Sequence, residues 1–253
     1  MKIIEATWEY RNFGRKAFEI LLDKRDFCSM DSVLSHFSNP KFLGSYVTVK
    51  LPVGDLNALH LLEDNGFRFM ETQLSVQYDL SKYKTPPELK KLLYPIAIRE
   101  IPHDISAWKE ISDRITPDLF ETDRISLDPL FGPEIGCFRY RNWILDLVNI
   151  TDSHLLIFYD PSDDNLEYGF TIDRFDEKTK IINGILAGVF TDCDKPGMGF
   201  SIYDASFRND IKRGAKILKS AISSNNPPVM AVDSALGVPI CKPIYVLRKQ
   251  FVL

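Results

Sequence analysis

GSYVTVKLPVGDLNALHLLEDNGFRFMETQLSVQYDL (residues 44–80) and GAKILKSAISSNNPPVMAVDSALGVPICKPIYVLRKQFVL (residues 214–253) are two copies of one unit. Each copy begins with Gly and continues as an apolar strand, a loop, a short helix and a long final strand. The helix start and the following Gly keep the same spacing in both, at Asp55 and Gly66 and at Asn226 and Gly237. An internal repeat is stronger evidence for the architecture than the secondary-structure propensities of single residues, so we infer two related halves. Only one of them need carry out chemistry.

The composition of the chain argues against two classes of partner, nucleic acid and membrane. The chain has 253 residues with 31 Lys and Arg against 35 Asp and Glu, a formal net charge of −4. This balance predicts no binding to nucleic acid, because such binding needs a basic surface. Charged residues interrupt each apolar run well short of the ~20 residues that cross a bilayer, so no membrane partner is expected.

The cysteines and histidines indicate neither a metal site nor a disulfide framework. The four cysteines have no CxxC spacing and the four histidines are scattered, at Cys28, Cys137, Cys193 and Cys241 and at His36, His60, His103 and His154. Met1–Glu9 has one Lys and no apolar core, so it does not resemble a secretion signal. We therefore expect buried free thiols, no metal and a cytoplasmic location.

Residues 81–95 contain three prolines and predict a boundary between the halves. We place a truncated first domain at 1–85 and the main domain at 96–253. In the main domain, apolar residues recur at helical spacing over Ile105–Ile115, with Asp104 as a candidate N-cap. Further elements are expected as a helix at Phe138–Leu147 and strands at His154–Tyr159, Leu166–Phe175, Thr179–Phe190, Ala215–Ser223 and Pro239–Val252. Such an order predicts an α/β fold with a mixed sheet.

A Gly-rich turn at 196–199 (PGMG) precedes a helical pattern from Phe200 to Arg213. Glycines ahead of a helix let backbone N–H groups approach a pyrophosphate, and the helix dipole favours the negative charge. A tight turn that merely begins the helix is the alternative. The long strand before the turn and the strand ending in Ser223-Ser224-Asn225-Asn226 favour a binding loop.

The segments INGILAGVF, PGMG, FSIYDASFRNDIKRGA, KILKSAISSNN and YVLRK occur in the order found in Gcn5-related N-acetyltransferases. From about Ile96 to Leu253 the chain resembles that family. The segments WEYRNFGRKAFEI, LHLLEDNGFRFMETQLSVQYDL and FRYRNWI extend the resemblance to bacterial dTDP-amino-sugar acetyltransferases of the dTDP-fucosamine type, which also begin with a truncated acetyltransferase-like half.

The resemblance implies that acetyl-CoA is the cosubstrate and lies in a splay between two central strands of the second half. Its pantetheine arm would pair with the backbone of Leu186, Ala187 and Gly188. The pyrophosphate would accept from the N–H groups of Gly197, Met198, Gly199 and Phe200, and Asn226 would touch the coenzyme. A neutral amine would then attack the thioester, which requires loss of the ammonium proton and a proton donor for the thiolate.

Two positions depart from the family pattern. Asp194 stands where Arg or Gln is usual ahead of the pyrophosphate loop, although Lys195 beside it could compensate. Asp233 stands where the family has a Tyr that donates the proton, and an ionised Asp cannot donate one. Tyr203 and Tyr245 are candidate replacements, so no catalytic residue is identified from the sequence.

The acceptor is expected to be a small amine, with an amino sugar on a nucleotide carrier as one form. Arg124, Arg139 and Arg141 lie where the acceptor pocket is shaped in this fold, and an Arg can bind a diphosphate. A catalytically degenerate protein that keeps the fold and binds a ligand is the second hypothesis, with Asp194 and Asp233 as marks of lost activity. The sequence leaves open whether the chain forms a homodimer.

Overall fold

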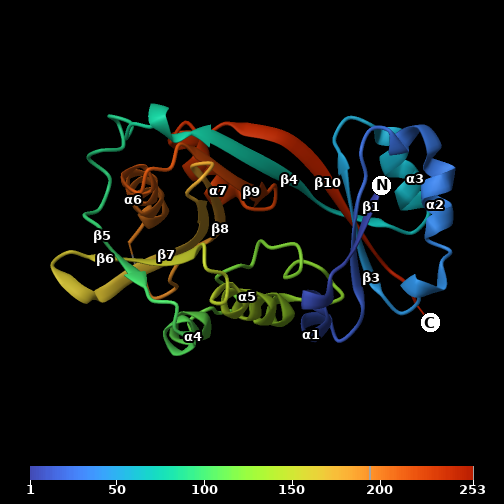
Figure 1. Cartoon of the computed structure of the whole chain (residues 1–253), viewed down its shortest axis with the longest axis horizontal. Coiled ribbons are helices and arrows are strands. Elements are labelled where there is room, and N and C mark those ends of the chain that lie inside the picture. The colour runs from blue at the N-terminus through green and yellow to red at the C-terminus, as the bar shows by residue number, and fades with distance from the viewer. Residues whose placement is uncertain (194, 253) are drawn as a thin grey trace.

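The computed structural model describes residues 1–193 and 195–252 and builds them around one ten-stranded mixed sheet (Figure 1). The strands lie in the order β1-β2-β3-β10-β4-β9-β8-β7-β6-β5. Their bounds are β1 Lys2–Glu5, β2 Ala17–Leu21, β3 Tyr46–Pro52, β4 Arg68–Asp79, β5 Ala97–Ile101, β6 Ser153–Asp160, β7 Asp163–Asp176, β8 Ile181–Val189, β9 Ile217–Ser223 and β10 Ile240–Gln250. The predicted mixed α/β sheet is confirmed.

Seven α-helices accompany these strands in the described part of the chain. They are α1 Tyr10–Phe13, α2 Met30–His36, α3 Leu56–Asp64, α4 Ile105–Asp113, α5 Pro133–Leu147, α6 Met198–Lys212 and α7 Pro227–Ala235. Each helix among the described residues is too short or too polar to cross a bilayer.

The repeated sequence unit has the same topology in both halves. The first half runs β2–α2–β3–α3–β4 and the second runs β8–α6–β9–α7–β10. In each, the first two strands are parallel neighbours, β2 with β3 and β8 with β9. The unit therefore begins one strand and one helix earlier than the sequence indicated.

Local capping explains where several helices begin. Asp55, Asp104 and Asn226 precede α3, α4 and α7, and each side chain accepts a hydrogen bond from a backbone N–H three residues on. Helix α5 begins at Pro133, ahead of the predicted Phe138. Proline suits the first helical position because its missing N–H would have no partner there.

The halves exchange their last strands. β10, from the second half, lies between β3 and β4 of the first half and is antiparallel to both. β4, from the first half, is antiparallel to β9 of the second half over seven residue pairs, Gln73–Asp79 with Ile217–Ser223. Consequently the sheet is continuous across both halves, and each half depends on a strand that the other contributes.

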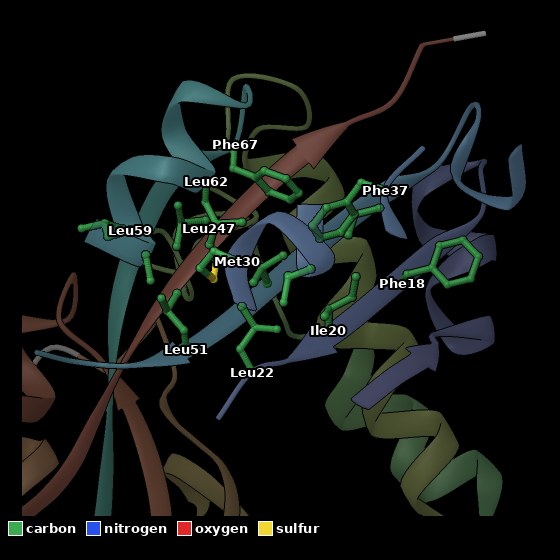
Figure 2. Packing of buried hydrophobic residues seen from close by; sticks show 14 of the residues in the cluster. Phe18, Ile20, Leu22, Met30, Phe37, Leu51, Leu59, Leu62, Phe67 and Leu247 are labelled. Carbon is green, nitrogen blue, oxygen red and sulfur yellow. The ribbon is translucent and has the colours of Figure 1, made fainter. Parts of the chain in front are cut away.

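Hydrophobic clusters cover the sheet on both faces. In the first half α2 and α3 pack on β2, β3 and β10, and Figure 2 shows Leu247 of β10 among the side chains of this cluster. In the second half α4 and α5 cover one face, with Trp108 and Ile144 fully buried. Helices α6 and α7 cover the opposite face (Figure 1).

The segment 81–95 is tied to α6. Asp204 of α6 is 1% exposed, and one of its oxygens accepts from Tyr83 Oη at 2.6 Å and from Thr85 Oγ1 at 2.5 Å. Ser201 accepts from the Tyr94 backbone N–H at 2.9 Å. The segment therefore packs against the second half by specific hydrogen bonds.

A buried carboxylate joins the loop before α5 to strands β3 and β10. Asp128 has no exposed surface and accepts two hydrogen bonds from Arg248 of β10, at 2.9 and 3.0 Å. It also accepts from Tyr46 Oη of β3 at 3.0 Å. Because three distant segments meet at one charge, this network fixes the loop on the first half.

Replacing Asp128 with Ala leaves Arg248 nearly buried without its counter-charge, and we expect a loss of about 3–5 kcal/mol in the free energy of unfolding. Chemical denaturation measures the loss. Asp146→Ala is the matched control, because Asp146 pairs with Arg11 at a half-exposed site and its loss should cost about 1 kcal/mol at most. Equal losses in the two variants would contradict the assignment.

Candidate functional site

The parallel strands β8 and β9 separate after three residue pairs, the last of which joins Asn183 and Lys219. Beyond that pair β8 remains paired with β7 as far as Val189, and β9 remains paired with β4 as far as Ser223. The register between β7 and β8 shifts so that Ile185 is an extra residue, a β-bulge that bends β8. An open slot results. The equivalent pair in the first half, β2 and β3, stays paired along the whole of β2 and has no such slot.

A cavity of about 350 Å³ occupies this slot. Gly184, Ile185, Leu186 and Ala187 all line it. Since successive residues of a strand face opposite sides of a sheet, the cavity reaches both faces. Helices lie against it on both faces of the sheet, and neighbouring strands and the loop before α5 complete its wall, so the site has two chambers, one on each face.

The chamber on the α6 side is lined by Tyr203, Ser206, Phe207 and Asp210 of α6, at helical spacing. Helix α7 adds Val229 and Asp233, and its N-cap residue Asn226 lines the same chamber. Apart from Phe207 and Val229, these side chains carry polar groups on the faces that the helices turn toward the sheet.

The chamber on the α5 side combines aromatic and charged groups. Phe120, Tyr140 and Trp143 form its aromatic wall, and Phe120 stacks on Tyr140 with centroids 4.0 Å apart. Its charged residues come from both halves of the chain, namely Glu19, Lys50 and Glu71 from the first and Asp123, Arg124 and Arg139 from the second.

Three of the residues predicted to bind the coenzyme line this cavity, namely Leu186, Ala187 and Asn226. The side-chain oxygen of Asn226 accepts from Val229 N at 3.2 Å, so it also caps α7. Gly188 is outside the lining. A Cβ there would lie 2.9 Å from the Phe170 ring, so packing within the sheet requires a glycine at this position.

The predicted pyrophosphate loop lies at the start of α6 and outside the cavity lining. Gly197 has a left-handed backbone, φ +76°, and precedes the helix as its N-cap. The Met198 and Phe200 N–H groups donate to the carbonyls of Lys195 and Gly197, at 3.2 and 3.0 Å. Gly199 has room for a side chain in the protein itself, since an added Cβ would lie 3.6 Å from Val232.

The two departures from the family pattern have different outcomes. Asp194 lies outside the described residues. Lys195, which could compensate for it, donates to Tyr168 Oη at 2.5 Å and to Asp160 at 3.4 Å. Its ammonium is therefore already engaged by neighbours within the protein.

Asp233 is 4% exposed and lines the cavity. Burial raises its pKa to about 6. Burial, together with the nearby Asp233 charge, also raises the pKa of Tyr203, so this hydroxyl keeps its proton at neutral pH. Tyr245, the other candidate proton donor, packs against the first-half core and stacks edge-on to Phe69, away from the cavity lining. The structure therefore distinguishes two tyrosines that the sequence could not.

A second buried acid was missed in the sequence. Asp210 is 3% exposed, and burial together with the Asp173 carboxylate raises its pKa to about 8. Arg213 binds Asp173 through two hydrogen bonds, at 2.8 and 3.1 Å, and approaches Asp210 at 3.5 Å. The signal was present in the helix period, because Asp210 follows Tyr203 and Phe207 on the same face of α6. Among the described residues, no group of His, Cys, Asp and Glu could hold a metal ion.

No family model and no curated protein matches the chain. A GCN5-related N-acetyltransferase from Sphaerobacter thermophilus is similar at a TM-score of 0.63 and 12% identity, covering 100% of this chain and 76% of that one. One from Kribbella flavida gives 0.54 and 9%, with 92% and 81% covered. A glucosamine N-acetyltransferase region of a fungal multi-domain beta-N-acetylglucosaminidase gives 0.56 and 14%, with 98% and 31% covered. At these identities the likeness shows the fold alone, which is that of the GCN5-related N-acetyltransferases.

The buried Asp233 predicts a specific dependence of stability on pH. Its pKa is raised on folding, so the folded state binds the proton more tightly, and the associated stability is lost as pH rises from about 4 to above about 6. Asp233→Asn removes this dependence. We expect the variant to be more stable than the wild type at pH 8 by up to ~3 kcal/mol, with little difference near pH 4.

Chemical denaturation at a series of pH values measures the effect. Asp113→Asn is the control for a change of one charge, because the Asp113 carboxylate is exposed and lies outside the cavity. A constant difference between the Asp233 variant and the wild type from pH 4 to 8 would rule out the raised pKa.

Proposed function

We propose that the chain is an acetyl-CoA-dependent N-acetyltransferase that acts on a small amine. The observation that carries this proposal is the open slot between β8 and β9, which holds a cavity reaching both faces of the sheet. Two substrates that meet through such a slot can react while water is excluded. The acyltransferase fold supports the same reaction class.

The residues fit a coenzyme in the slot. The edge of β8 beyond Asn183 has no β9 residue paired to it in the described chain, so its backbone groups can pair with an amide-containing arm as a strand would. Leu186 and Ala187 lie on this edge. The start of α6 at Gly197–Phe200 would receive the pyrophosphate, favoured by the helix dipole. The coenzyme itself would supply the acetyl thioester.

The departing thiolate requires a proton, and we propose Tyr203 as its donor. Tyr203 lines the cavity and holds its proton at neutral pH. Asp233 lines the same chamber, but with a pKa of about 6 it is mostly ionised at pH 7 and above. A tyrosine hydroxyl can donate at any pH at which the amine is reactive.

An amino sugar remains our proposal for the acceptor, and one neighbouring structure contains a region described as a glucosamine N-acetyltransferase. A nucleotide carrier on that sugar has less support. Arg124 pairs with Glu71 at 3.2 Å and Arg139 with Glu9 at 2.7 Å. Arg141 donates to the carbonyls of Asp113 and Ile115, at 3.3 and 2.7 Å. Each of these Arg side chains already has a partner in the protein, and among their buried nitrogens in the described chain only the Nε of Arg124 is left without one. A diphosphate would have to compete with these partners.

The expected division into a first domain at 1–85 and a second at 96–253 stays a proposal, as do the cytoplasmic location and the homodimer. A catalytically degenerate binding protein is the second candidate function. The buried carboxylate of Asp233 at the position of the usual tyrosine favours it. Turnover of acetyl-CoA with an amine would exclude this candidate.

Substitution at Gly199 tests coenzyme binding. The protein can hold a small side chain there, so Gly199→Val should fold, but the side chain would block the approach of a pyrophosphate to the backbone. We expect at least ~10-fold weaker binding of acetyl-CoA, with a smaller loss for Gly199→Ala. Calorimetry measures the affinity and thermal unfolding checks the fold. Unchanged affinity in a folded Val variant would refute the site.

A pair of variants tests the proton donor. Tyr203→Phe should lower kcat by ~100-fold or more, the range for loss of a general acid, while acetyl-CoA still binds. Asp233→Asn should lower kcat by less than ~10-fold, because its ionised form gives no proton. Steady-state assays with acetyl-CoA and glucosamine measure both. The reverse order of effects would make Asp233 the donor.

A further inference from the structure

The α5-side chamber of the cavity has walls from both halves of the chain. Glu19 of β2, Lys50 of β3 and Glu71 of β4 come from the first half. The loop residues 120–124 and helix α5 come from the second. The first half has no open slot of its own, and it contributes wall residues to the cavity of the second half. An acceptor bound in this chamber would therefore contact residues from both halves.

The cations of this chamber are each matched by a carboxylate. Lys50 Nζ lies 2.8 Å from Glu19, and Arg124 lies 3.2 Å from Glu71, which is itself 3% exposed. Arg139 lies 2.7 Å from Glu9. Arg124 Nε is buried without a hydrogen-bond partner in the described chain and can still donate to a neutral oxygen of a ligand. An anion that drew one of these cations away from its partner would leave a buried carboxylate without its counter-charge, which is costly.

Asp123 is the carboxylate of the chamber that lacks such a match. Among residues 1–193 and 195–252, no Lys or Arg nitrogen lies within 4.0 Å of its oxygens in an ion pair. Burial lowers the pKa values of Arg124 and Arg139, but the carboxylates of Glu71 and Glu9, together with that of Asp123, outweigh it and raise both. Two guanidinium groups thus face Glu71, Glu9 and Asp123, which leaves one carboxylate in excess.

Asp123 is also held in place. One oxygen accepts from Tyr140 Oη at 2.9 Å and the other from the Ile125 N–H at 2.8 Å. Each oxygen keeps a further lone pair for a donor. Phe120 and Trp143 border the same chamber. Aromatic faces and a fixed, unmatched carboxylate both favour a cation.

We propose that Asp123 binds the ammonium group of the acceptor, and that the acceptor is a compact cationic amine without a phosphate group. This inference rests on the proposed function. It adds the residue that binds the acceptor and the net positive charge of that acceptor. The carboxylate selects and orients the amine. Proton loss from the ammonium precedes attack on the acetyl group and is not assigned to Asp123.

The test is calorimetric binding of amines to the full-length protein, with and without saturating CoA. The probes are glucosamine, ethanolamine and putrescine, together with glucosamine phosphate, in which the same amine carries an added anion. We expect at least one unphosphorylated amine to bind, and glucosamine phosphate to bind ~10-fold more weakly than glucosamine or not at all.

Asp123→Asn should weaken the binding of that amine by ~30-fold or more, because it removes the charge from a hydrogen-bonded pair. Its affinity for CoA should stay within about twofold of the wild type, since the residue lies on the acceptor side. Asp123→Ser is the second variant, because its hydroxyl can still accept from the Ile125 N–H. Asp113→Asn, an exposed carboxylate on α4 paired with Lys109, is the matched control and should change nothing.

The outcomes separate the two proposals. If CoA binds but the Asp123 variants bind the amine as the wild type does, Asp123 is not the ammonium site and the proposed function stands. Tighter binding of glucosamine phosphate, or no binding of any amine in the presence of CoA, would also overturn the inference. Loss of amine binding in the variants of a protein that does not bind CoA would uphold the Asp123 site and refute the acetyltransferase.

Discussion

The exchange of the last strands between the two halves is the constraint on which the rest of the structure depends. β10 can complete the first half only by lying between β3 and β4, and β4 then becomes the neighbour of β9. The first-half core contains Leu247 from the end of the chain. Such a core cannot close until the second half has been synthesised, so the two halves are expected to fold as one cooperative unit.

The same exchange shapes the slot. β9 is paired with β4 over seven residue pairs, and β8 is paired with β7. With each strand fixed on its outer side, the bulge at Ile185 separates them without loss of the sheet. A slot held open from both sides is preorganised, which reduces the ordering cost of binding a long flexible ligand. In the first half the parallel strands stay together over a filled core, so the open slot is a feature of the second copy alone in the described chain.

Charge is distributed unevenly around the cavity. On the α6 side Asp173, Asp210 and Asp233 are buried with Arg213 as the close counter-charge of the first two. Burying a carboxylate costs stability unless it is paired or protonated, so Asp233 and Asp210 lower stability at neutral pH. On the α5 side almost every charge is matched within the protein. The buried carboxylates on the α6 side therefore lower the stability of the fold, whereas most of the charges on the α5 side are paired within the protein. Buried groups with perturbed pKa values are more typical of functional sites than of cores.

The sequence by itself determined the features that depend on neighbours along the chain. The internal repeat, the caps at Asp104 and Asn226, the hairpin of β7 and β8 and the start of α6 near Gly197–Phe200 all follow from spacing, capping and turn chemistry. These gave the fold class. The resemblance to the acetyltransferase family pointed to the second half and to Leu186, Ala187 and Asn226, which line the cavity.

Only the tertiary structure decided the features that join distant segments. Strand exchange is invisible in sequence because β4 and β10 satisfy the same hydrogen bonds in either half. The burial that raises the pKa of Asp233, the separation of Tyr203 from Tyr245, and the pairing of Arg124 with Glu71 all depend on side chains that are remote in the chain. Desolvation and ion pairing are set by three-dimensional neighbours, so the unmatched charge of Asp123 could be recognised only once both halves were folded together.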